Sequence, residues 1–320
     1  MNRHFYIILN RHAGQGHAAD VWTTIAAELA RQSVDYTLAE TEYAGHATLL
    51  AEQFAKHHQE STVTEVVLVV GGDGTLNQVL NGLQDAHSAH QLPIAYIPAG
   101  SGNDFARGAH ISQEPLTALN QVLAASAPQS LDIGRYEETI KKERRYFVNN
   151  VGIGFDAAIV SAANHSTDKK TLNRMNMGNL AYLRQIFHVL GQQDSFPVTV
   201  HIGTRREIFP NGFLVTTSNH PYFGGGVPIL PNATVKDGQL SLIVVEKLSW
   251  PRFAFLFSLI PTGRHLRFKA VHQYKAREIH LTVSALEFGQ VDGEEMGTRF
   301  FDIYLMIDQY PFWFTETTAH

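Results

Sequence analysis

The chain of 320 residues contains no cysteine, which excludes disulfide bonds and thiolate metal ligands. It also lacks any apolar run near the ~18 residues that a membrane-spanning helix needs, and its first residues lead into a strand-like segment instead of a secretory signal. Asp and Glu outnumber Lys and Arg by 30 to 25, which gives a formal net charge of −5. This charge argues against a general nucleic-acid partner. We therefore expect a cytoplasmic protein that binds no nucleic acid.

The sequence has no internal repeat and no low-complexity tract. Its 17 histidines form no zinc-like spacing, because His57-His58 and the pair His87 and His90 lie in polar segments typical of solvated surface. What the chain does contain is 44% hydrophobic and 10% aromatic residues, enough for packed cores. Its length then predicts two domains of ordinary size.

Four short β-rich runs alternate with amphipathic helical segments in the first part of the chain. This alternation is typical of a parallel sheet covered by helices, and it predicts a doubly wound α/β domain over residues 1–130. In such sheets, ligands bind beyond the carboxyl ends of the strands. The predicted strands are Phe5–Asn10, Val34–Glu40, Val63–Val70 and Pro93–Pro98, and the predicted helices are His17–Gln32, Ala44–His58 and a segment that starts near Leu76.

Longer β runs separated by turns follow, and they predict a second, mostly antiparallel β domain over residues 131–295. Two predicted helices interrupt it, Met177–Leu190 and Trp250–Ile260. The last β run, Phe300–Ile307, could belong to either domain by its periodicity, and we expect the C-terminal segment 296–320 to pack on the first domain. The other predicted strands are Leu131–Tyr136, Arg145–Ile153, Pro197–Ile202, Gly212–Ser218, Leu240–Glu246 and Ile279–Val283.

The segment Gly71-Gly72-Asp73-Gly74-Thr75 lies between an apolar strand-like run and a helix-like segment. Glycines allow the backbone to turn sharply, and the first amides of the next helix are free to bind an anion. The carboxylate of Asp73 would repel phosphate unless a divalent cation lay between them. The segment therefore predicts a site for a nucleotide and Mg²⁺. A tight turn without a ligand is the alternative.

Three further loops fall where the same site would form. Asn10–Gly16 offers small residues and backbone amides after the first strand, although an ordinary turn has a similar composition. Pro98–Phe105 places glycines beside Ser101 and an Asn-Asp pair, which could bind metal or cap a helix. Val291–Glu294 brings carboxylates after a β run of the second domain, where a plain β-turn is the alternative. Together the four loops predict one cleft between the domains.

The sequence resembles the diacylglycerol kinase catalytic family, specifically the bacterial soluble lipid kinases related to diacylglycerol and sphingosine kinases. The resemblance covers essentially the whole chain and implies an ATP- and Mg²⁺-dependent kinase for the hydroxyl of diacylglycerol or a similar lipid alcohol. It rests on motifs in the family's order and at about its spacing. These are Gly71–Thr75, Gly100–Ala106, Asp132-Ile133-Gly134, Gly152–Asp156, Asp237-Gly238 and Val291–Glu294.

The resemblance also implies roles for individual residues. Asp292 would be the general base that accepts the proton of the lipid hydroxyl, with Glu294 in support. The implied metal-binding residues are Asp73, Asp104 and Asp132 for a catalytic Mg²⁺ and water network, and Asp237, Thr234 and Gln239 for a structural Mg²⁺ in the second domain. The implied nucleotide-binding residues are Asn10, Arg11, His12, Ala13, Gly14, Thr41, Gly71, Gly72, Asp73, Gly74, Thr75, Leu76, Asn77, Gln78, Ser101, Asn103 and Asp104.

The first loop departs from the family pattern, because Asn10–Gly14 lacks the Pro and Ser of the common Asn-Pro-x-Ser-Gly. Arg11 either replaces them as a phosphate contact or is solvated. This departure motivates one alternative function, a catalytically weak nucleotide- or lipid-binding regulator. The other alternative is an NAD kinase, since those enzymes share the Gly-Gly-Asp-Gly-Thr turn. The motifs Gly100–Phe105 and Val291–Glu294 favour the lipid kinase.

A kinase that acts on a lipid docks transiently on a bilayer, so we expect an interfacial segment. Trp250–Lys269 places large apolar side chains before Arg264, Arg267 and Lys269, a pattern that suits an anionic lipid surface. The alternative is a buried helix followed by an exposed basic turn, because apolar residues occupy nearly all faces of the helix. For the oligomeric state, a two-fold homodimer is the default expectation.

Overall fold

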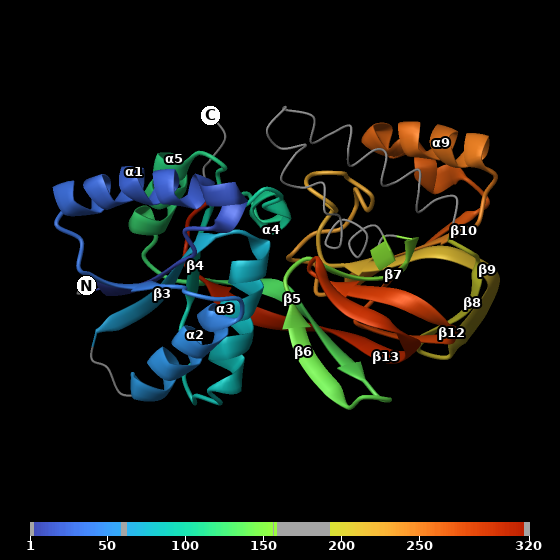
Figure 1. Cartoon of the computed structure of the whole chain (residues 1–320), viewed down its shortest axis with the longest axis horizontal. Coiled ribbons are helices and arrows are strands. Elements are labelled where there is room, and N and C mark those ends of the chain that lie inside the picture. Colours follow the sequence, from blue (N-terminus) through green and yellow to red (C-terminus); the bar gives the residue numbers. More distant parts are fainter. Residues whose placement is uncertain (1–2, 59–62, 156, 159–192, 317–320) are drawn as a thin grey trace.

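The β-rich runs of the first part of the chain form a parallel sheet with helices on both faces, as the sequence predicts (Figure 1). The computed structural model describes residues 3–58, 63–155, 157–158 and 193–316. The strand order is β2-β1-β3-β4, and all three pairings are parallel. The elements of this domain are β1 (Arg3–Leu9), the 3-10 helix η1 (Ala13–Gly16), α1 (His17–Arg31), β2 (Tyr36–Glu40), α2 (His46–His57), β3 (Thr64–Gly71), α3 (Asp73–Asp85), β4 (Ile94–Pro98), α4 (Asp104–Gly108) and α5 (Pro115–Ala124).

Two strands of this sheet, β3 and β4, are deeply buried. Every residue of β4 and the last six of β3 are buried. Helices α1 and α5 cover one face of the sheet, and α2 and α3 cover the other (Figure 1). In α1 the buried side chains of Val21, Ile25 and Leu29 recur every four residues, so one face of the helix packs on the sheet. Burial on both faces explains why these strands are continuous apolar runs.

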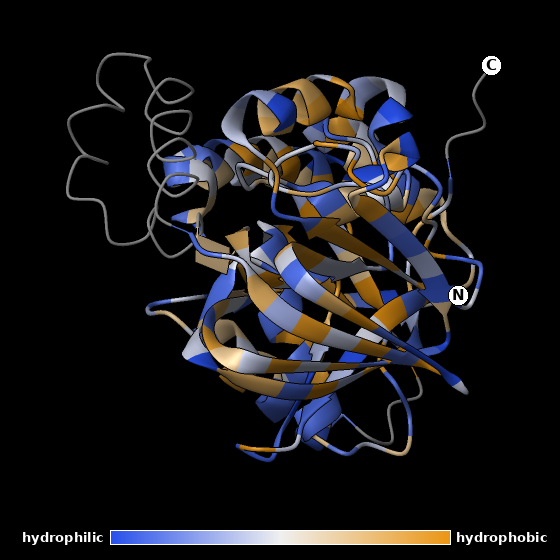
Figure 2. Ribbon diagram, turned by 90° about the vertical axis from the view of Figure 1, so that its right-hand side faces the viewer, coloured by the Kyte–Doolittle hydropathy of each residue, from blue (hydrophilic) through white to orange (hydrophobic). Residues whose placement is uncertain are grey.

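The second domain is mostly antiparallel, as predicted. Strand β9 pairs with β7, β8 and β10, and β12 pairs with β7, β8 and β13, all in antiparallel directions. Hydrophilic and hydrophobic residues alternate along its strands (Figure 2), which is typical of a sheet with one face on a core and one in solvent. The elements are β5 (Gln129–Glu138), β6 (Glu143–Phe147), β7 (Asn150–Gly154), β8 (Phe196–Ile202), β9 (Arg205–Ser218), β10 (Leu240–Glu246), α9 (Trp250–Ser258), the 3-10 helices η3 (Ile260–Thr262) and η4 (Arg264–Arg267), β11 (Val271–Ala276), β12 (Glu278–Val291) and β13 (Glu294–Phe312).

One long strand joins the two domains into a single sheet. β13 pairs with β12 in the second domain, then with β5 from Ile303 to Phe312, and its last residue pairs with Ile94 of β4. The predicted return of the C-terminal segment to the first domain is therefore confirmed. The predicted domain boundaries at 130/131 and 295/296 fall inside β5 and β13, so backbone hydrogen bonds continue from one domain to the other.

Some elements differ from the sequence prediction for local reasons. The predicted strand Arg145–Ile153 is two strands, because the two residues between β6 and β7 turn their amides toward Asp292. Strand β11 carried no prediction, since its polar residues hide the alternation of a strand. Helix α3 already begins at Asp73, so most of the glycine-rich segment is its first turn. The predicted helix Met177–Leu190 lies outside the described residues.

Gly134 lies opposite Phe147 in the β5–β6 pair, and a Cβ atom on it would lie 1.9 Å from Cζ of that ring. We predict that Gly134→Ala lowers the free energy of unfolding by about 1–3 kcal/mol, because the buried ring must shift to make room. Gly74→Ala is the matched control, since the nearest atom to a Cβ there is 4.0 Å away. Chemical denaturation checks the prediction, and equal stability of both variants would contradict it.

Candidate functional site

The loops after β1, β3 and β4 lie together at one end of the parallel sheet. Chain order reverses between β1 and β3, so the loops that follow these two strands leave in opposite directions and open a crevice. Asn10 and Thr75 join two of the loops through a hydrogen bond of 3.0 Å from Nδ2 to Oγ1. A cavity of about 380 Å³, called the crevice cavity below, is lined by Asn10, Ala13, Gly14, Gly72, Asp73, Gly74, Thr75, Gln78, Gly100, Ser101 and Asp292. The four predicted loops thus meet at one place.

Two glycines allow the loops after β3 and β4 to touch. A Cβ atom on Gly100 would lie 2.5 Å from Cα of Gly72, and one on Gly72 would lie 3.2 Å from Cα of Gly100. Backbone atoms cannot move aside as a flexible side chain can, so this approach requires glycine on both sides. Gly71 ends β3 beside this contact, where its carbonyl accepts a hydrogen bond of 2.7 Å from the amide of Ala99. Small residues and the first amides of α3 therefore surround the cavity, as an anion site requires.

Asp73 turns its carboxylate toward the first amides of α4. Oδ2 accepts from the amide of Asp104 at 3.1 Å, and Oδ1 accepts from the amide of Phe105 at 3.3 Å. The side chain of Asn149, from the second domain, lies near this carboxylate and also lowers its pKa. Burial, and then the charge of Asp104, raises the pKa of Asp73 to about 6 despite these donors. A carboxylate in this state is stabilised in its charged form by a cation.

Asp104 lies beside Asp73 and joins the two domains. Its Oδ2 accepts from the amide of Gly225 at 2.8 Å, and its Oδ1 accepts from Nη1 of Arg107 at 3.2 Å. Gly225 belongs to a run of three glycines, 224–226, all with left-handed φ, for which the sequence offered no prediction. Burial raises the pKa of Asp104, although these hydrogen-bond donors lower it. Asp104 does not line the crevice cavity, so its carboxylate serves the domain contact.

Asp292 comes from the second domain and lines the crevice cavity. It forms the turn after β12 with a left-handed φ of 49°. Its carboxylate accepts four hydrogen bonds: Oδ2 from Nδ2 of Asn77 and the amide of Val148, both at 2.8 Å, and Oδ1 from the amides of Asn149 and Asn150, both at 2.9 Å. Burial nevertheless raises its pKa to about 7. A fixed carboxylate with a pKa near neutrality suits a group that accepts a proton.

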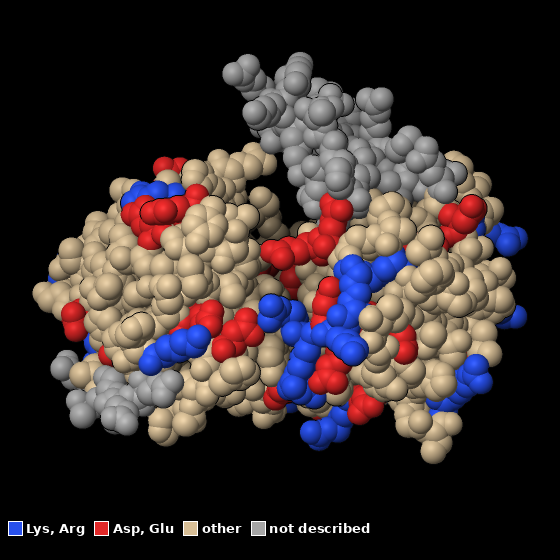
Figure 3. Space-filling model, turned by 60° about the horizontal axis from the view of Figure 1, so that its bottom comes forward, with Lys and Arg blue, Asp and Glu red and all other residues tan. Residues whose placement is uncertain are grey.

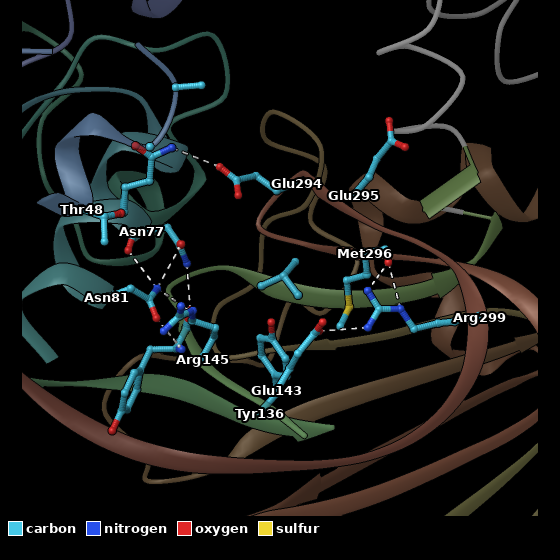
Figure 4. Close-up of a pocket in the computed structure, with 15 residues that line it drawn as sticks. Thr48, Asn77, Asn81, Tyr136, Glu143, Arg145, Glu294, Glu295, Met296 and Arg299 are labelled. Atoms are coloured by element: carbon cyan, nitrogen blue, oxygen red, sulfur yellow. Dashed lines mark hydrogen bonds and ion pairs between the residues drawn. The ribbon is translucent and has the colours of Figure 1, made fainter. Parts of the chain in front are cut away.

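A larger cavity, called the junction cavity below, adjoins the crevice cavity between the domains (Figure 4). It measures about 580 Å³. Gln78 lines both cavities, and its Nε2 donates to Oε1 of Glu294 at 3.3 Å across the junction. The lining residues are Ala44, Gly45, Thr48, Asn77, Gln78, Asn81, Tyr136, Glu143, Arg145, Tyr146, Val291, Glu294, Glu295, Met296 and Arg299. Of these, sequence reasoning selected only Asn77, Gln78 and Glu294.

Arg145 and Arg299 line the junction cavity but were not predicted as site residues. In the sequence each resembles a surface charge near a strand end. Arg145 pairs with Asp85 on α3 at 3.1 Å, which links β6 to the first domain. Arg299 pairs with Glu143 at 3.0 Å within the second domain. Lys and Arg side chains gather among acidic ones between the two lobes on one face of the molecule (Figure 3). Only contacts between distant segments show that these charges border a cavity.

Two residues predicted to contact the nucleotide have side chains that serve the fold. The side chain of Leu76 is fully buried in the core of the first domain, and its amide donates to the carbonyl of Gly72. Asn103 closes its own loop, because Oδ1 accepts from the amide of Gly100 at 2.9 Å and Nδ2 donates to the carbonyl of Gly100 at 3.0 Å. Their contact with a nucleotide stays a prediction.

Arg11, His12 and Thr41 lie outside both cavities. Arg11 forms a two-pronged ion pair with Glu40, with N–O distances of 2.6 and 2.7 Å, so its guanidinium turns toward β2. His12 is exposed. The amide of Thr41 donates to the carbonyl of Leu9 at 2.9 Å, which continues the β1–β2 pairing. None of the three predicted contacts lines the crevice cavity or the junction cavity.

Asp132 lies in the buried interior of β5 and lines neither cavity. Its Oδ2 accepts from the amide of Gly238 at 2.7 Å, and its Oδ1 accepts from Nε2 of Gln309 at 3.2 Å. Its carbonyl accepts from Nδ2 of Asn219 at 2.8 Å. The carboxylate of Asp132 thus holds the turn around Gly238 against the sheet, and its part in a Mg²⁺ and water network stays a prediction.

A lysine ammonium takes the place expected for a structural Mg²⁺. Nζ of Lys275 lies 2.6 Å from Oδ2 of Asp237 and donates to the carbonyl of Asn232 at 2.7 Å. Gln239 contributes its amide, which donates to Oδ1 of Asp237 at 3.1 Å, and Thr234 is exposed. Among the described residues, no three His, Cys, Asp or Glu side chains cluster as a metal site. The residues of this turn therefore do not fit the predicted structural Mg²⁺.

Asp73 is the predicted metal ligand that lines the crevice cavity together with the anion-binding loops. Mg²⁺ that arrives with a nucleotide uses one or two protein carboxylates and takes its other ligands from phosphates and water. The raised pKa of Asp73 indicates that its negative charge lacks full compensation. The residues present thus fit a Mg²⁺ ion carried by nucleotide phosphates.

Two family profiles match the chain, one for each domain. Residues 4–136 match the diacylglycerol kinase catalytic domain, and residues 149–302 match the YegS C-terminal NAD kinase beta sandwich-like domain. The first range contains Asp73 and the glycine loops, and the second contains Asp292. The matches therefore include both sides of the crevice cavity.

Individual relatives cover most of the chain. A diacylglycerol kinase of Staphylococcus aureus (strain JH9) is 30% identical over 261 residues, which are 80% of this chain and 75% of that protein. A protein of Bacillus subtilis (strain 168) named as a candidate lipid kinase, YtlR, is 29% identical over 301 residues, or 92% and 94% of the two chains. A solved structure of a candidate diacylglycerol kinase from Bacillus anthracis str. Sterne has the same fold, with a TM-score of 0.75 at 23% identity and coverage of 99% and 97%.

The ammonium of Lys275 makes the turn around Asp237 independent of divalent metal. We predict that Mg²⁺ without nucleotide leaves the Tm of the wild type unchanged, whereas Lys275→Met lowers the Tm in EDTA and recovers part of it in Mg²⁺. The variant frees the carboxylate of Asp237 for an ion that binds only the folded state. Calorimetry with EDTA or MgCl₂ checks this. A Mg²⁺-dependent rise in the wild type that Asp237→Asn abolishes would contradict it.

Proposed function

The chain belongs to the diacylglycerol kinase catalytic family of lipid kinases, and from this premise we propose that it transfers the γ-phosphate of ATP, with Mg²⁺, to the hydroxyl of diacylglycerol or a similar lipid alcohol. One observation carries the proposal beyond the family. Asp292 of the second domain lines the same cavity as Asp73 and the glycine loops of the first domain. A base, a metal ligand and an anion site therefore face one another.

The crevice cavity suits the phosphates of ATP. The first amides of α3, together with the amide and the hydroxyl of Ser101, offer donors to phosphate oxygens. Asp73 would hold Mg²⁺, which when bound neutralises charge on those oxygens. In phosphoryl transfer, positioning and charge stabilisation supply most of the catalysis, because the protein needs little covalent chemistry. The composition of this cavity supports that division of work.

Asp292 is the general base in this proposal. The lipid hydroxyl gives its proton to the carboxylate of Asp292, and its oxygen forms a bond to the γ-phosphorus. The bond from that phosphorus to the bridging oxygen breaks, and ADP leaves. Four hydrogen bonds hold the carboxylate while it does so. Glu294 supports the base, since its hydrogen bond to Gln78 fixes the turn against α3.

The junction cavity suits the nucleoside end of ATP. It shares Gln78 with the crevice cavity, so one ligand can extend from one into the other. Its amide side chains, Asn77 and Asn81, and the carboxylate of Glu294 offer hydrogen-bond partners for a base and for ribose hydroxyls. We therefore place the phosphates in the crevice cavity and the nucleoside in the junction cavity.

We place transient membrane contact at α9 and the turns that follow it. No helix in the described ranges is long and apolar enough to cross a membrane. Helix α9 has features of both alternatives from the sequence, an interfacial segment and a buried helix. Phe253 and Leu256 are buried, whereas Phe255 and Phe257 are 58% and 40% exposed. Residues 247–277 contain seven Lys and Arg and no Asp or Glu. Exposed aromatic rings in a cationic stretch suit a surface of anionic lipids.

The two alternative functions have weaker support. An NAD kinase would share the Gly71–Thr75 segment and the sandwich-like second domain, but the catalytic-domain match is to diacylglycerol kinases. A catalytically weak regulator would require that the altered loop Asn10–Gly14 fails to bind phosphate, yet Asn10, Ala13 and Gly14 line the crevice cavity. Measured turnover separates all three functions. The homodimer and the cytoplasmic location stay predictions.

We predict Mg²⁺-dependent transfer of labelled γ-phosphate from ATP to a lipid alcohol in a panel presented in micelles, with no transfer to NAD. Asp292→Asn should lower kcat ~10²- to 10⁴-fold, because an amide cannot accept the hydroxyl proton. Its affinity for Mg·ADP, measured by calorimetry, should stay near that of the wild type. Phosphorylated NAD, or nucleotide binding without any phosphorylated lipid, would contradict the proposed function.

Asp302→Asn is the matched control for this assay. Asp302 is a β13 carboxylate that is hydrogen-bonded to His280 and Thr139 and lines neither cavity. Its kcat should equal that of the wild type. A comparable loss in this variant would show that the effect of Asp292→Asn comes from a disturbed sheet and not from proton transfer.

The raised pKa of Asp292, about 7, also predicts the pH dependence of the reaction. Only the ionised carboxylate accepts a proton, so activity is lost as the pH falls through this pKa. We expect kcat/KM to rise about tenfold per pH unit below about pH 7 and to level off above it. Steady-state kinetics across this range check the prediction. A profile that is flat through pH 7 would argue against Asp292 as the base.

A further inference from the structure

Asn149 contacts both carboxylates of the proposed site. Its backbone amide donates to Oδ1 of Asp292 at 2.9 Å, and its side chain lies close enough to the carboxylate of Asp73 to lower the pKa of that group. Asn149 is 4% exposed and lies between β6 and β7. It therefore belongs to the second domain by sequence while its side chain reaches a residue of the first.

His220 fixes which way the amide of Asn149 points. The imidazole is fully buried, and its Nδ1 accepts a hydrogen bond of 3.2 Å from the amide of Tyr222. Nδ1 therefore carries no proton, and in the neutral ring Nε2 is the protonated nitrogen. Nε2 donates to Oδ1 of Asn149 at 2.7 Å. Because Oδ1 is the acceptor of that bond, the NH₂ group of Asn149 is the side that remains for Asp73, in line with the lowering effect of Asn149 on the pKa of that carboxylate.

The surroundings hold His220 neutral and in place. Burial lowers its pKa to about 3, so the ring carries no charge near neutral pH. A Cβ atom on Gly108 of α4 would lie 2.7 Å from Cβ of His220, so the ring packs directly on the first domain. Oγ of Ser218 lies 2.8 Å from the carbonyl of His220 and 2.9 Å from that of Asn149, which holds the two backbones together. The imidazole is thus a rigid donor.

We propose that Asn149, oriented by His220, is a positioning residue that sets Asp73 and Asp292 relative to each other across the domain junction. The roles of the two carboxylates rest on the proposed function. Packing alone does not explain this series of polar contacts, because a buried imidazole and a buried amide are costly in a core unless they are hydrogen-bonded. Here the hydrogen bonds run from the amide of Tyr222 through His220 to Oδ1 of Asn149, and the NH₂ group of Asn149 remains for Asp73.

Loss of the imidazole would change the group that Asp73 meets. Without the Nε2 donor, Asn149 can rotate its carbonyl oxygen toward Asp73 and replace a donor with an acceptor. The carboxylate of Asp73 then loses a favourable NH₂ group and faces a like partial charge. Residues that orient a metal-binding side chain in this way typically change metal affinity or activity by ~10- to 100-fold. We therefore expect loss of the imidazole to weaken Mg·nucleotide binding as well as to slow turnover.

The test compares His220→Leu, His220→Gln, Asn149→Ala and the double variant Asn149→Ala/His220→Leu. We expect His220→Leu to weaken Mg·ADP binding ~10-fold in calorimetry and to lower kcat/KM ~10- to 100-fold. His220→Gln should stay within about threefold of the wild type, because its Nε2 can donate to Asn149. The double variant should be no worse than Asn149→Ala alone, because His220 acts through Asn149.

Thr217→Val is the matched control for removal of a buried polar group. Thr217 is fully buried on β9, two residues before Asn219, and its Oγ1 has no hydrogen-bond partner in the part of the chain that the structure describes. This variant should keep the wild-type affinity for Mg·ADP and the wild-type kcat. A loss as large as that of His220→Leu would overturn the positioning role, because any change in this core would then have the same effect.

Three results would overturn the proposal: wild-type Mg·ADP affinity in His220→Leu, equal impairment in His220→Gln, or additive losses in the double variant. Circular dichroism checks the fold of each variant. If His220→Leu does not fold, the other single variants decide. A loss of Mg·ADP affinity in Asn149→Ala but not in His220→Gln supports the proposal, and equal affinities of these two variants overturn it. If the variants show the expected pattern of Mg·ADP affinities but the wild-type protein phosphorylates no lipid, the positioning role stands and the proposed function is overturned.

Discussion

The pairing of β13 with β5 holds the two sides of the site at a fixed separation. The residues from Ile303 to Phe312 pair in register with those from Glu138 back to Gln129, and β13 ends beside β4 of the parallel sheet. The same strand begins two residues after Asp292. A shift of the second domain against the first would therefore break the backbone pairing between the end of β13 and β4. A continuous sheet, and not a flexible linker, brings the carboxylate of Asp292 to the loops of the first domain.

Within this frame, backbone amides hold the two carboxylates of the site and the neighbouring carboxylate of Asp104. Asp73 faces the first amides of α4, Asp104 faces the amide of Gly225, and Asp292 faces three successive amides at 148–150. These donors fix the positions of the oxygens, yet burial still raises the pKa of all three groups. The site thus has ordered negative charge without full compensation. A metal ion with a nucleotide supplies positive charge there, and a substrate hydroxyl supplies a proton.

The sequence was informative where the chemistry is local. Glycine next to a strand end, a carboxylate in the turn and alternating elements sufficed to predict the sheet and the loops of the crevice cavity, whereas Asp292 was selected through the family resemblance. Side-chain direction was harder to predict. Leu76 follows a motif residue directly but faces the core, and Asp132 belongs to a motif but points into the second domain. Motif membership alone does not tell on which side of its strand or helix a residue lies.

Contacts between distant segments could not be predicted from one sequence. His220 reads as one histidine among 17, and only the fold brings it to Asn149, 71 positions earlier. Lys275 likewise lies in a segment without a predicted strand, and only the fold brings it to Asp237. The central claim is that loops of the first domain and Asp292 of the second form one phosphate site. A crystal structure with Mg²⁺ and ADP tests it most directly. The account predicts the β-phosphate in the crevice cavity, Mg²⁺ on Asp73 and the carboxylate of Asp292 facing the open side of that phosphate. Phosphates bound outside this cavity, or Asp292 turned away from them, would contradict it.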